Sequence, residues 1–281
     1  MSSYRLEDVT ELVKYVLFTD YVSLDIEQKQ VAVSAVLIAN AESGKTSIIE
    51  RYYPNNGILY ANDITAWGIQ HRWLDDMSKG KIRRLLIPDL INPVNRKQET
   101  VNSLITFLNS YISWEGVKCI MTYGMQIELD EPVRGSIITT ITPQDFNRMA
   151  KGLAAIGFLS RLIPITYAYS DATIDIILDS IIEDKKAWDK IKLQLPDKCQ
   201  PIVFDNNLAR LLKPQAKFIG SDAGVYGMRA LHALRALCRA RALSELRFEV
   251  TKDDVDRISE LARRFIKYPR EVNLEVLKGG N

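Results

Sequence analysis

Residues 39–46 carry the pattern with the clearest chemical meaning in this chain. They read Ala-Asn-Ala-Glu-Ser-Gly-Lys-Thr and directly follow an apolar segment. This matches the phosphate-loop spacing, except that alanine stands where the first glycine is usual. A loop that wraps a polyphosphate must turn its backbone N–H groups inward and open a helix there, whose dipole adds positive potential. The spacing therefore predicts a nucleotide-phosphate site.

Each residue type in this loop suits one role in such a site. Gly44 permits a close approach of the backbone, Lys45 reaches the β- and γ-phosphates, and the Thr46 hydroxyl can ligate Mg²⁺. The alternative is an ordinary strand-to-helix turn, but the apolar strand before the loop favours the nucleotide site. The predicted nucleotide contacts are Asn40, Ala41, Glu42, Ser43, Gly44, Lys45, Thr46 and Ser47.

A site of this kind also needs a carboxylate at the end of a neighbouring strand, to hold the magnesium shell and polarise the attacking water. Asp89 ends the apolar run 85–88, with Pro88-Asp89 in place of the usual Asp-Glu pair. It is expected in the metal-shell role or the water-activating role. Glu99 is the nearest acid downstream, although an exposed first-turn glutamate is the favoured interpretation. This departure predicts slow or partner-stimulated hydrolysis.

Alternating strands and helices must position these groups. Strands are predicted at 31–39, 58–61, 83–89, 136–141 and 162–169, and the most apolar of them are rich in β-branched residues, as buried parallel strands are. Helices are expected at 1–20, 66–77, 101–112 and from Pro143. This alternation predicts right-handed crossovers and a parallel sheet covered on both faces. Residues 117–133 are predicted to form a hairpin that turns at Tyr123-Gly124.

The remaining chain divides by composition. Residues 229–246 are dense in Ala, Leu and Arg, which favour helix, and Thr251 with Asp254 resembles a capping box. Residues 171–205 are weakly patterned, with a charge run at 183–186 interpreted as a solvated helix face. The predicted organisation is an N-terminal helix and linker (1–30), an α/β nucleotide-binding core (31–170), a connecting segment (171–205), a helical unit (206–270) and a tail (271–281).

Composition excludes several classes of protein. The 281 residues include 37 Lys+Arg and 35 Asp+Glu, so the net charge of +2 gives no bulk signal for nucleic acid. Three scattered cysteines and two histidines make a zinc site improbable and fit a reducing compartment. The longest apolar run, 31–39, is shorter than the ~20 residues that cross a bilayer. We expect a cytoplasmic protein with no membrane partner.

Four further segments extend the pattern. Residues 136–143 form a strand that ends in Thr142 before proline, and residues 157–162 read Gly-Phe-Leu-Ser-Arg-Leu. Residues 229–237 read Arg-Ala-Leu-His-Ala-Leu-Arg-Ala-Leu, and residues 250–255 read Val-Thr-Lys-Asp-Asp-Val. In their order and spacing these segments, with the loop, resemble the AAA+ P-loop ATPases, and within them the branch that contains the mini-chromosome-maintenance helicases.

The resemblance implies a three-layer α/β core with a parallel sheet, followed by a small all-helical lid. It implies ATP and Mg²⁺ as cofactors, with Thr46 and Asp89 at the metal. Thr142 stands where the family has the asparagine of its first sensor, Arg161 matches the arginine that reaches the nucleotide of the next subunit, and Arg229 matches the second sensor. The alternatives are a helix N-cap for Thr142 and surface or packing arginines for Arg161 and Arg229.

An arginine supplied in trans implies subunits packed head to tail, in a hexameric ring or a helical filament. The expected function is an ATP-hydrolysing motor or loader that acts on single- or double-stranded DNA in replication, recombination or mobile-element maintenance. The alternatives are a protein-remodelling ATPase acting on a partner complex and an ATP-binding switch with little hydrolysis. Lys118, Met121, Tyr123 and Arg134 on or beside the predicted hairpin suit single-stranded nucleic acid, a threaded polypeptide or a purely structural hairpin.

Overall fold

Five parallel strands form the central sheet of the computed structural model, which describes residues 6–23, 32–122, 125–183, 189–222 and 225–269. Their order is β3-β4-β7-β2-β8. This confirms the predicted α/β class with a parallel sheet. The strands are β2 (Ser34–Ile38), β3 (Gly57–Tyr60), β4 (Ile82–Ile87), β7 (Ser136–Ile141) and β8 (Leu162–Thr166).

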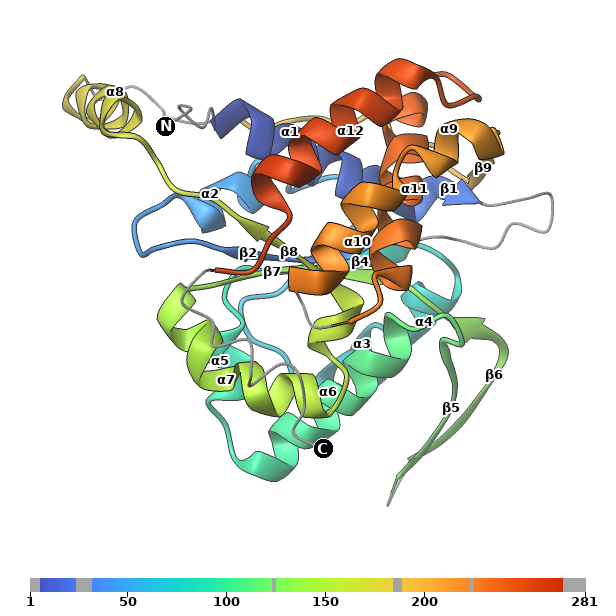
Figure 1. The fold of residues 1–281 in the computed structure, drawn as a ribbon. Coiled ribbons are helices and arrows are strands. Elements are labelled where there is room, and N and C mark those ends of the chain that lie inside the picture. Colours follow the sequence, from blue (N-terminus) through green and yellow to red (C-terminus); the bar gives the residue numbers. More distant parts are fainter. Residues whose placement is uncertain (1–5, 24–31, 123–124, 184–188, 223–224, 270–281) are drawn as a thin grey trace.

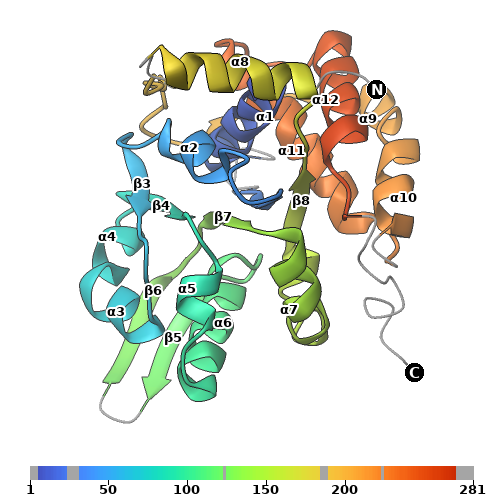
Figure 2. The same cartoon turned by 90° about the vertical axis from the view of Figure 1, so that its left-hand side faces the viewer.

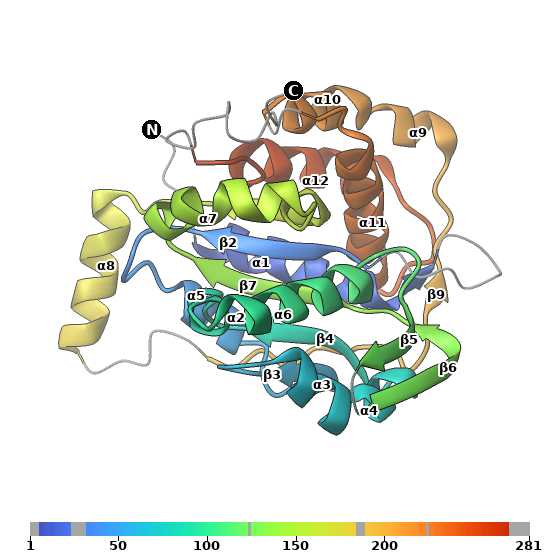
Figure 3. The same cartoon turned by 90° about the horizontal axis from the view of Figure 1, so that it is seen from below.

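The strand β2, which lies between β7 and β8, alternates its side chains between two apolar layers. Ala35 and Leu37 face one layer, and Val36 and Ile38 face the other. The first layer contains α1 (Leu6–Phe18) and α2 (Lys45–Glu50), and the second contains α3 (Ala66–Arg72), α4 (Leu74–Ser78), α6 (Gln98–Tyr111) and α7 (Pro143–Ala155). The short α5 (Ile91–Val94) follows β4. Figure 3 shows α6 and α7 in front of the strands and α1 behind them.

The C-terminal helices pack into the first of these layers. They are α9 (Asn206–Arg210), α10 (Lys213–Asp222), α11 (Met228–Ser244) and α12 (Lys252–Phe265). Buried residues of α11 and α12 belong to the same apolar cluster as those of α1 and β2. Arg257 on α12 also forms ion pairs with Asp8 and Glu11 on α1. The helical unit therefore shares one core with the N-terminal helix and one face of the sheet.

The start of α12 confirms the capping box. The Asp254 carboxylate accepts hydrogen bonds from the Thr251 backbone N–H, at 2.8 Å, and from the Thr251 hydroxyl. Arg241 and Arg247 form ion pairs with the same carboxylate. Burial alone would raise the pKa of Asp254, but the hydrogen bonds from Arg247 and Thr251 outweigh this effect, so that the pKa lies below its ordinary value.

A buried ion pair lies at the edge of the sheet where the strands begin. Arg84 on β4 is fully buried, and its Nε donates to Asp20 Oδ2 at 2.6 Å. Asp20 lies in a short 3₁₀ turn, Thr19–Tyr21, after α1, and its second oxygen accepts from the Ser136 hydroxyl at 2.5 Å. The guanidinium also donates to the carbonyl oxygens of Val16 and Val33. These bonds join the N-terminal helix to the amino edge of the sheet.

The predicted hairpin is present as β5 (Val117–Thr122) and β6 (Met125–Val133), which pair antiparallel. It projects from the body of the molecule (Figure 2). Its Tyr123-Gly124 turn lies outside the described residues, as do residues 24–31, residues 184–186 of the charge run and the tail 271–281.

Two local expectations differ from the structure. The helix predicted at 66–77 is interrupted at Trp73, whose φ of −121° is not helical, and is therefore two short helices. The connecting segment, which showed no clear pattern, contains the regular helix α8 (Asp171–Ile182). The short strands β1 (Val22–Ser23) and β9 (Gln200–Pro201) pair beside the main sheet. Across the described ranges, the structure has no helix long and apolar enough to cross a membrane.

Candidate functional site

The loop between β2 and α2 lies at the carboxyl edge of the sheet. Gly44 has φ 70° and ψ 16°, in the left-handed region, and is the N-cap of α2. Glycine adopts this conformation without the steric penalty of a Cβ atom. Glu42 also has a positive φ, 59°. The chain therefore turns tightly here, and the first N–H groups of α2 have no acceptors within the helix.

Lys45 points back into this loop. Only 9% of the residue is exposed, and its Nζ donates to the carbonyl oxygens of Ala39 at 2.8 Å and Asn40 at 2.6 Å. Burial lowers the pKa of Lys45, and the charge of Asp89 partly opposes this shift. An ammonium group has three donor hydrogens, so these two carbonyls leave one for a further acceptor. Lys45 and Asp89, far apart in sequence, are thus within electrostatic reach of each other.

Ser43 adds an unsatisfied polar group to the loop. Its Oγ is buried and has no hydrogen-bond partner among the described residues. A buried hydroxyl without a partner costs about 1–3 kcal/mol, so a ligand that bonds to it recovers that energy. The Ser43 carbonyl oxygen accepts from the hydroxyls of Tyr167, at 3.0 Å, and Tyr169. These tyrosines follow β8, so that the chain beyond this strand anchors the loop.

Asp89 lies just beyond the end of β4. Its Oδ1 accepts from the Ile91 backbone N–H at 2.9 Å, which fixes the carboxylate at the start of α5. The turn is joined to β7, because the Thr140 hydroxyl donates to the Pro88 carbonyl oxygen at 2.6 Å and Leu90 N–H donates to the Thr140 carbonyl oxygen. β7 separates β4 from β2, so the strand before Asp89 is the next but one to the loop strand rather than its neighbour.

Thr142 directly follows β7, whose strand lies between β4 and β2, and is the N-cap of α7. Its Oγ1 accepts from the Asp145 backbone N–H at 3.2 Å and donates to the Asp145 carboxylate at 2.7 Å. The N-cap interpretation is therefore confirmed. Thr46 is exposed at the start of α2, where a cation can reach its hydroxyl, and Glu99 is exposed in the first turn of α6.

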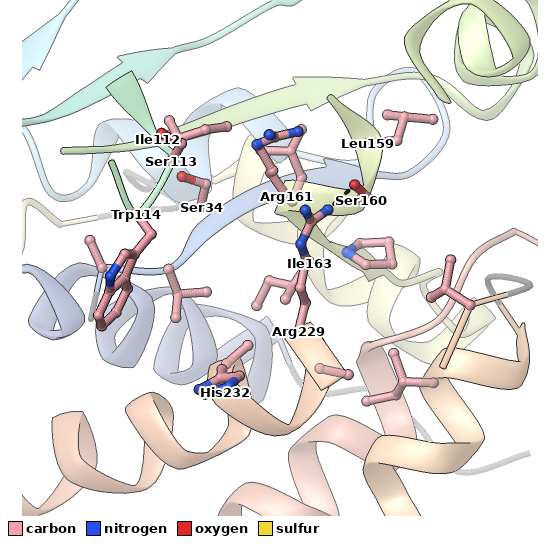
Figure 4. A pocket seen from close by; sticks show the side chains of 18 of the residues that line it. Ser34, Ile112, Ser113, Trp114, Leu159, Ser160, Arg161, Ile163, Arg229 and His232 are labelled. Atoms are coloured by element: carbon pink, nitrogen blue, oxygen red, sulfur yellow. Dashed lines mark hydrogen bonds between the residues drawn. The ribbon is translucent and has the colours of Figure 1, made fainter. Parts of the chain in front are cut away.

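The two arginines lie together, near the amino edge of the sheet. Arg161 immediately precedes β8, and its Nη1 donates to the Gly157 carbonyl oxygen at 2.7 Å. Arg229, in the first turn of α11, donates to the Ser160 hydroxyl. Burial lowers the pKa of Arg161, and the charge of Arg229 lowers it further. Figure 4 shows both side chains beside Ser160 at a cavity of about 600 Å³.

The loop and the arginine pair are on opposite edges of the same sheet. Ser34, the first residue of β2, pairs with Leu162, the residue after Arg161, whereas the loop follows the last residue of β2. A strand of five residues spans about 16 Å, so roughly that length separates the two groups. Within one chain the structure thus brings Lys45, Ser43 and Asp89 together, and it places Arg161 and Arg229 elsewhere.

Sequence reasoning did not identify Tyr167 and Tyr169 as parts of the loop's surroundings. The available signal was their spacing of two residues directly after a strand, which puts both side chains on one face. Ser160 belongs to the segment 157–162, and its contact with Arg229 spans 69 residues, which no local pattern reveals.

No protein-family model matches this chain, and no curated protein is significantly similar to it.

Proposed function

We propose that this chain is an ATPase of the AAA+ type, which binds ATP with Mg²⁺ at the carboxyl edge of the sheet and hydrolyses it. The observation that carries this proposal is the convergence of a buried lysine, an unpartnered buried serine hydroxyl and a carboxylate around one glycine-initiated helix. A phosphate chain with its cation matches these groups, because it offers oxygen acceptors to Lys45 and Ser43.

Thr46 and Asp89 provide the hydroxyl and carboxylate oxygens that Mg²⁺ prefers, and these residues would hold it. When bound, the cation supplies positive charge to the β- and γ-phosphates. Lys45 adds a fixed positive charge and a free donor hydrogen. Among the described residues, Asp89 is the carboxylate whose charge acts on Lys45, so on this proposal a single acid serves the site. This supports slow hydrolysis, since metal binding and water activation compete for one group.

The arginine pair supports a site that two copies of the chain share. Phosphoryl transfer develops negative charge that a positioned guanidinium stabilises. Arg161 and Arg229 are a strand length from their own loop but adjoin each other at an open cavity. Head-to-tail packing would bring this edge to the loop of the next copy, in a closed ring or a helical filament. On this proposal both arginines act in trans.

The proposal has two versions, which differ in the macromolecule that the ATPase acts on. A DNA-directed motor or loader follows from the helicase-like motifs. The hairpin favours a protein-remodelling ATPase, because the exposed charged side chains of its described strands are mostly acidic. They are Glu128, Asp130 and Glu131, with Lys118 as the one basic residue among them. Carboxylates repel a phosphate backbone. ATP turnover measured with single-stranded DNA or with an unfolded polypeptide decides between them, and DNA stimulation should weaken as salt rises.

The nucleotide site itself is tested by binding of a fluorescent ATP analogue with Mg²⁺. Lys45→Ala should weaken binding by about 100-fold or more, because the loop loses a buried cation. The matched control is Lys79→Ala, which removes an exposed lysine whose partner is the exposed Asp75, and it should bind as the wild type does. Equal affinity of the wild type and Lys45→Ala would refute the site.

A further inference from the structure

Helix α8 is the most exposed apolar element of the described structure. None of its residues from Asp171 to Ile182 is buried. Figures 1 and 3 show it apart from the other helices, at the end of the molecule opposite the β5–β6 hairpin. A helix of this length extends about 18 Å. Apolar helices in a folded protein normally bury one face, and within the described residues α8 has no element packed against such a face.

The apolar residues of α8 form a stripe. Ile174, Ile177, Leu178 and Ile181 have the spacing i, i+3, i+4 and i+7, which places them on one face of a helix. A row of carboxylates runs along one side of this stripe, because Asp171, Asp175 and Asp179 follow one another at intervals of four. The free surface is therefore apolar with an acidic border.

The position of α8 links it to the proposed nucleotide site. Its N-cap, Ser170, follows β8 by a short segment that contains Tyr167 and Tyr169. Both tyrosine hydroxyls donate to the Ser43 carbonyl oxygen in the phosphate loop. The helix therefore leaves the carboxyl edge of the sheet, at the side of the molecule that carries the loop.

The opposite edge has a surface that matches the stripe. The cavity of about 600 Å³ beside Arg161 and Arg229 is lined largely by apolar residues, and Trp114 and Val225 are exposed among them. Arg134 also lines this cavity, and its Nε is buried without a hydrogen-bond partner in the described structure. The lining therefore contains three arginines and one carboxylate, Glu115, so its charged groups are mainly positive.

We propose that α8 of one copy docks, through its apolar stripe, against the apolar rim of the arginine-lined cavity of the next copy. The occupant is a second copy of this chain, because the two surfaces lie at opposite edges of one sheet and differ in charge. Apolar side chains meet Trp114 and Val225, and the aspartates approach arginines. The inference rests on the shared site proposed above, since head-to-tail packing is what brings these edges together.

Docking of α8 would also couple assembly of the oligomer to nucleotide binding. A helix held by the neighbouring copy fixes the chain that carries Tyr167 and Tyr169, and through them the Ser43 carbonyl oxygen of the loop. Association through α8 and closure of the loop around a phosphate chain would then stabilise each other, as linked binding events must.

The experiment compares two variants of α8 in sedimentation velocity with ATP and Mg²⁺. The first, Leu178→Asp with Ile181→Asp, places carboxylates on the stripe. The control, Ile176→Asp, changes an equally exposed isoleucine that lies off the stripe, 69% exposed against 61% for Ile181. The stripe variant should raise the dissociation constant for self-association at least about tenfold, whereas the control should not. Binding of the ATP analogue at saturating nucleotide should persist in both.

The outcomes separate the two proposals. A stripe variant that assembles as the wild type does overturns the docking of α8, even where ATP binding and the Arg161 effect described below are intact. A wild-type chain that binds no ATP overturns the proposed function and, with it, this inference. Because all three substituted side chains are exposed, helix content measured by circular dichroism should match the wild type in each variant.

A cross-link tests the contact directly. Ile181→Cys in one chain and Val225→Cys in another, mixed and treated with a short bis-maleimide, should give a covalent dimer above the background of either variant alone. That background is required because Cys119 is exposed. Leu211→Cys, on an exposed residue outside the cavity lining, is the matched control for Val225. Equal yields from the Val225 and Leu211 pairs would contradict the docking.

Discussion

The two edges of the sheet carry different groups that one nucleotide site would need. At the carboxyl edge, buried Lys45 faces Asp89 and the unpartnered hydroxyl of Ser43. At the amino edge, burial and the charge of Arg229 lower the pKa of Arg161, and no carboxylate is bonded to either arginine among the described contacts. The first edge suits binding of a phosphate chain, and the second suits stabilisation of charge that develops on it. The difference indicates that one chain contains both sets of groups but does not join them.

The edges also differ in how they are built. The amino edge is fixed by the fully buried Arg84, whose guanidinium bonds Asp20 and two backbone carbonyls. The carboxyl edge consists of turns after β2, β4 and β7, held by hydroxyl-to-carbonyl bonds such as those from Thr140 and Tyr167. In the proposed shared site, the amino edge is held by a buried ion pair, whereas the proposed phosphate-binding edge consists of turns, which must admit and release the ligand.

The largest expected effect separates the roles of the two edges. Arg161→Ala should lower the ATP turnover number by about 10³-fold or more, because an arginine in trans stabilises the transition state to that extent. ATP affinity should change little. The control is Arg148→Ala, whose side chain is exposed and paired with Asp145, and it should turn over ATP normally. A turnover number for Arg161→Ala equal to that of the control would remove the amino edge from the reaction.

The second prediction concerns the stability of the amino edge. Asp20→Ala leaves the Arg84 guanidinium buried without its carboxylate, which should lower the free energy of unfolding by about 3–5 kcal/mol. Asp63→Ala breaks an exposed ion pair with Arg96 instead, and should cost less than about 1 kcal/mol. Urea unfolding at neutral pH measures both. Similar costs for the two variants would show that the buried pair does not fix this edge.

The smallest effect concerns Thr142, the N-cap of α7. Thr142→Ala removes the hydroxyl that caps α7 and should lower the free energy of unfolding by about 1 kcal/mol. Thr142→Ser retains the hydroxyl and should retain the stability. If Thr142 acts only as a cap, both variants hydrolyse ATP at rates near that of the wild type. A turnover number that falls tenfold in the alanine variant, and recovers in the serine variant, would assign it the sensor role.

Sequence patterns predicted what depends on neighbouring residues. The apolar run around β2, the hairpin strands and the Thr251–Asp254 capping box all follow from local periodicity or from a short motif. The grouping of Lys45 with Asp89 was expected because parallel strands end at one edge. Each of these predicted features lies within one secondary-structure element or follows from the parallel direction of the strands, and both can be inferred from the sequence.

The unpredicted features depend on packing between distant segments. Arg84 occurs in an apolar run, and only the fold brings it to Asp20, 64 residues away. The place of Arg229 beside Ser160 follows from how α11 packs against α1 and the sheet. Helix α8 was missed because its apolar stripe is bordered by regularly spaced aspartates, so that the segment resembles a mixed, solvated stretch.

The central claim is that the nucleotide site joins the loop of one copy to the arginines of another. The most direct test mixes Lys45→Ala with Arg161→Ala, each inactive alone, at a concentration where the wild type is assembled. An intact loop then meets an intact arginine pair at about one interface in four, so the mixture should regain roughly a quarter of the wild-type turnover. A mixture no more active than its two components would contradict the shared site.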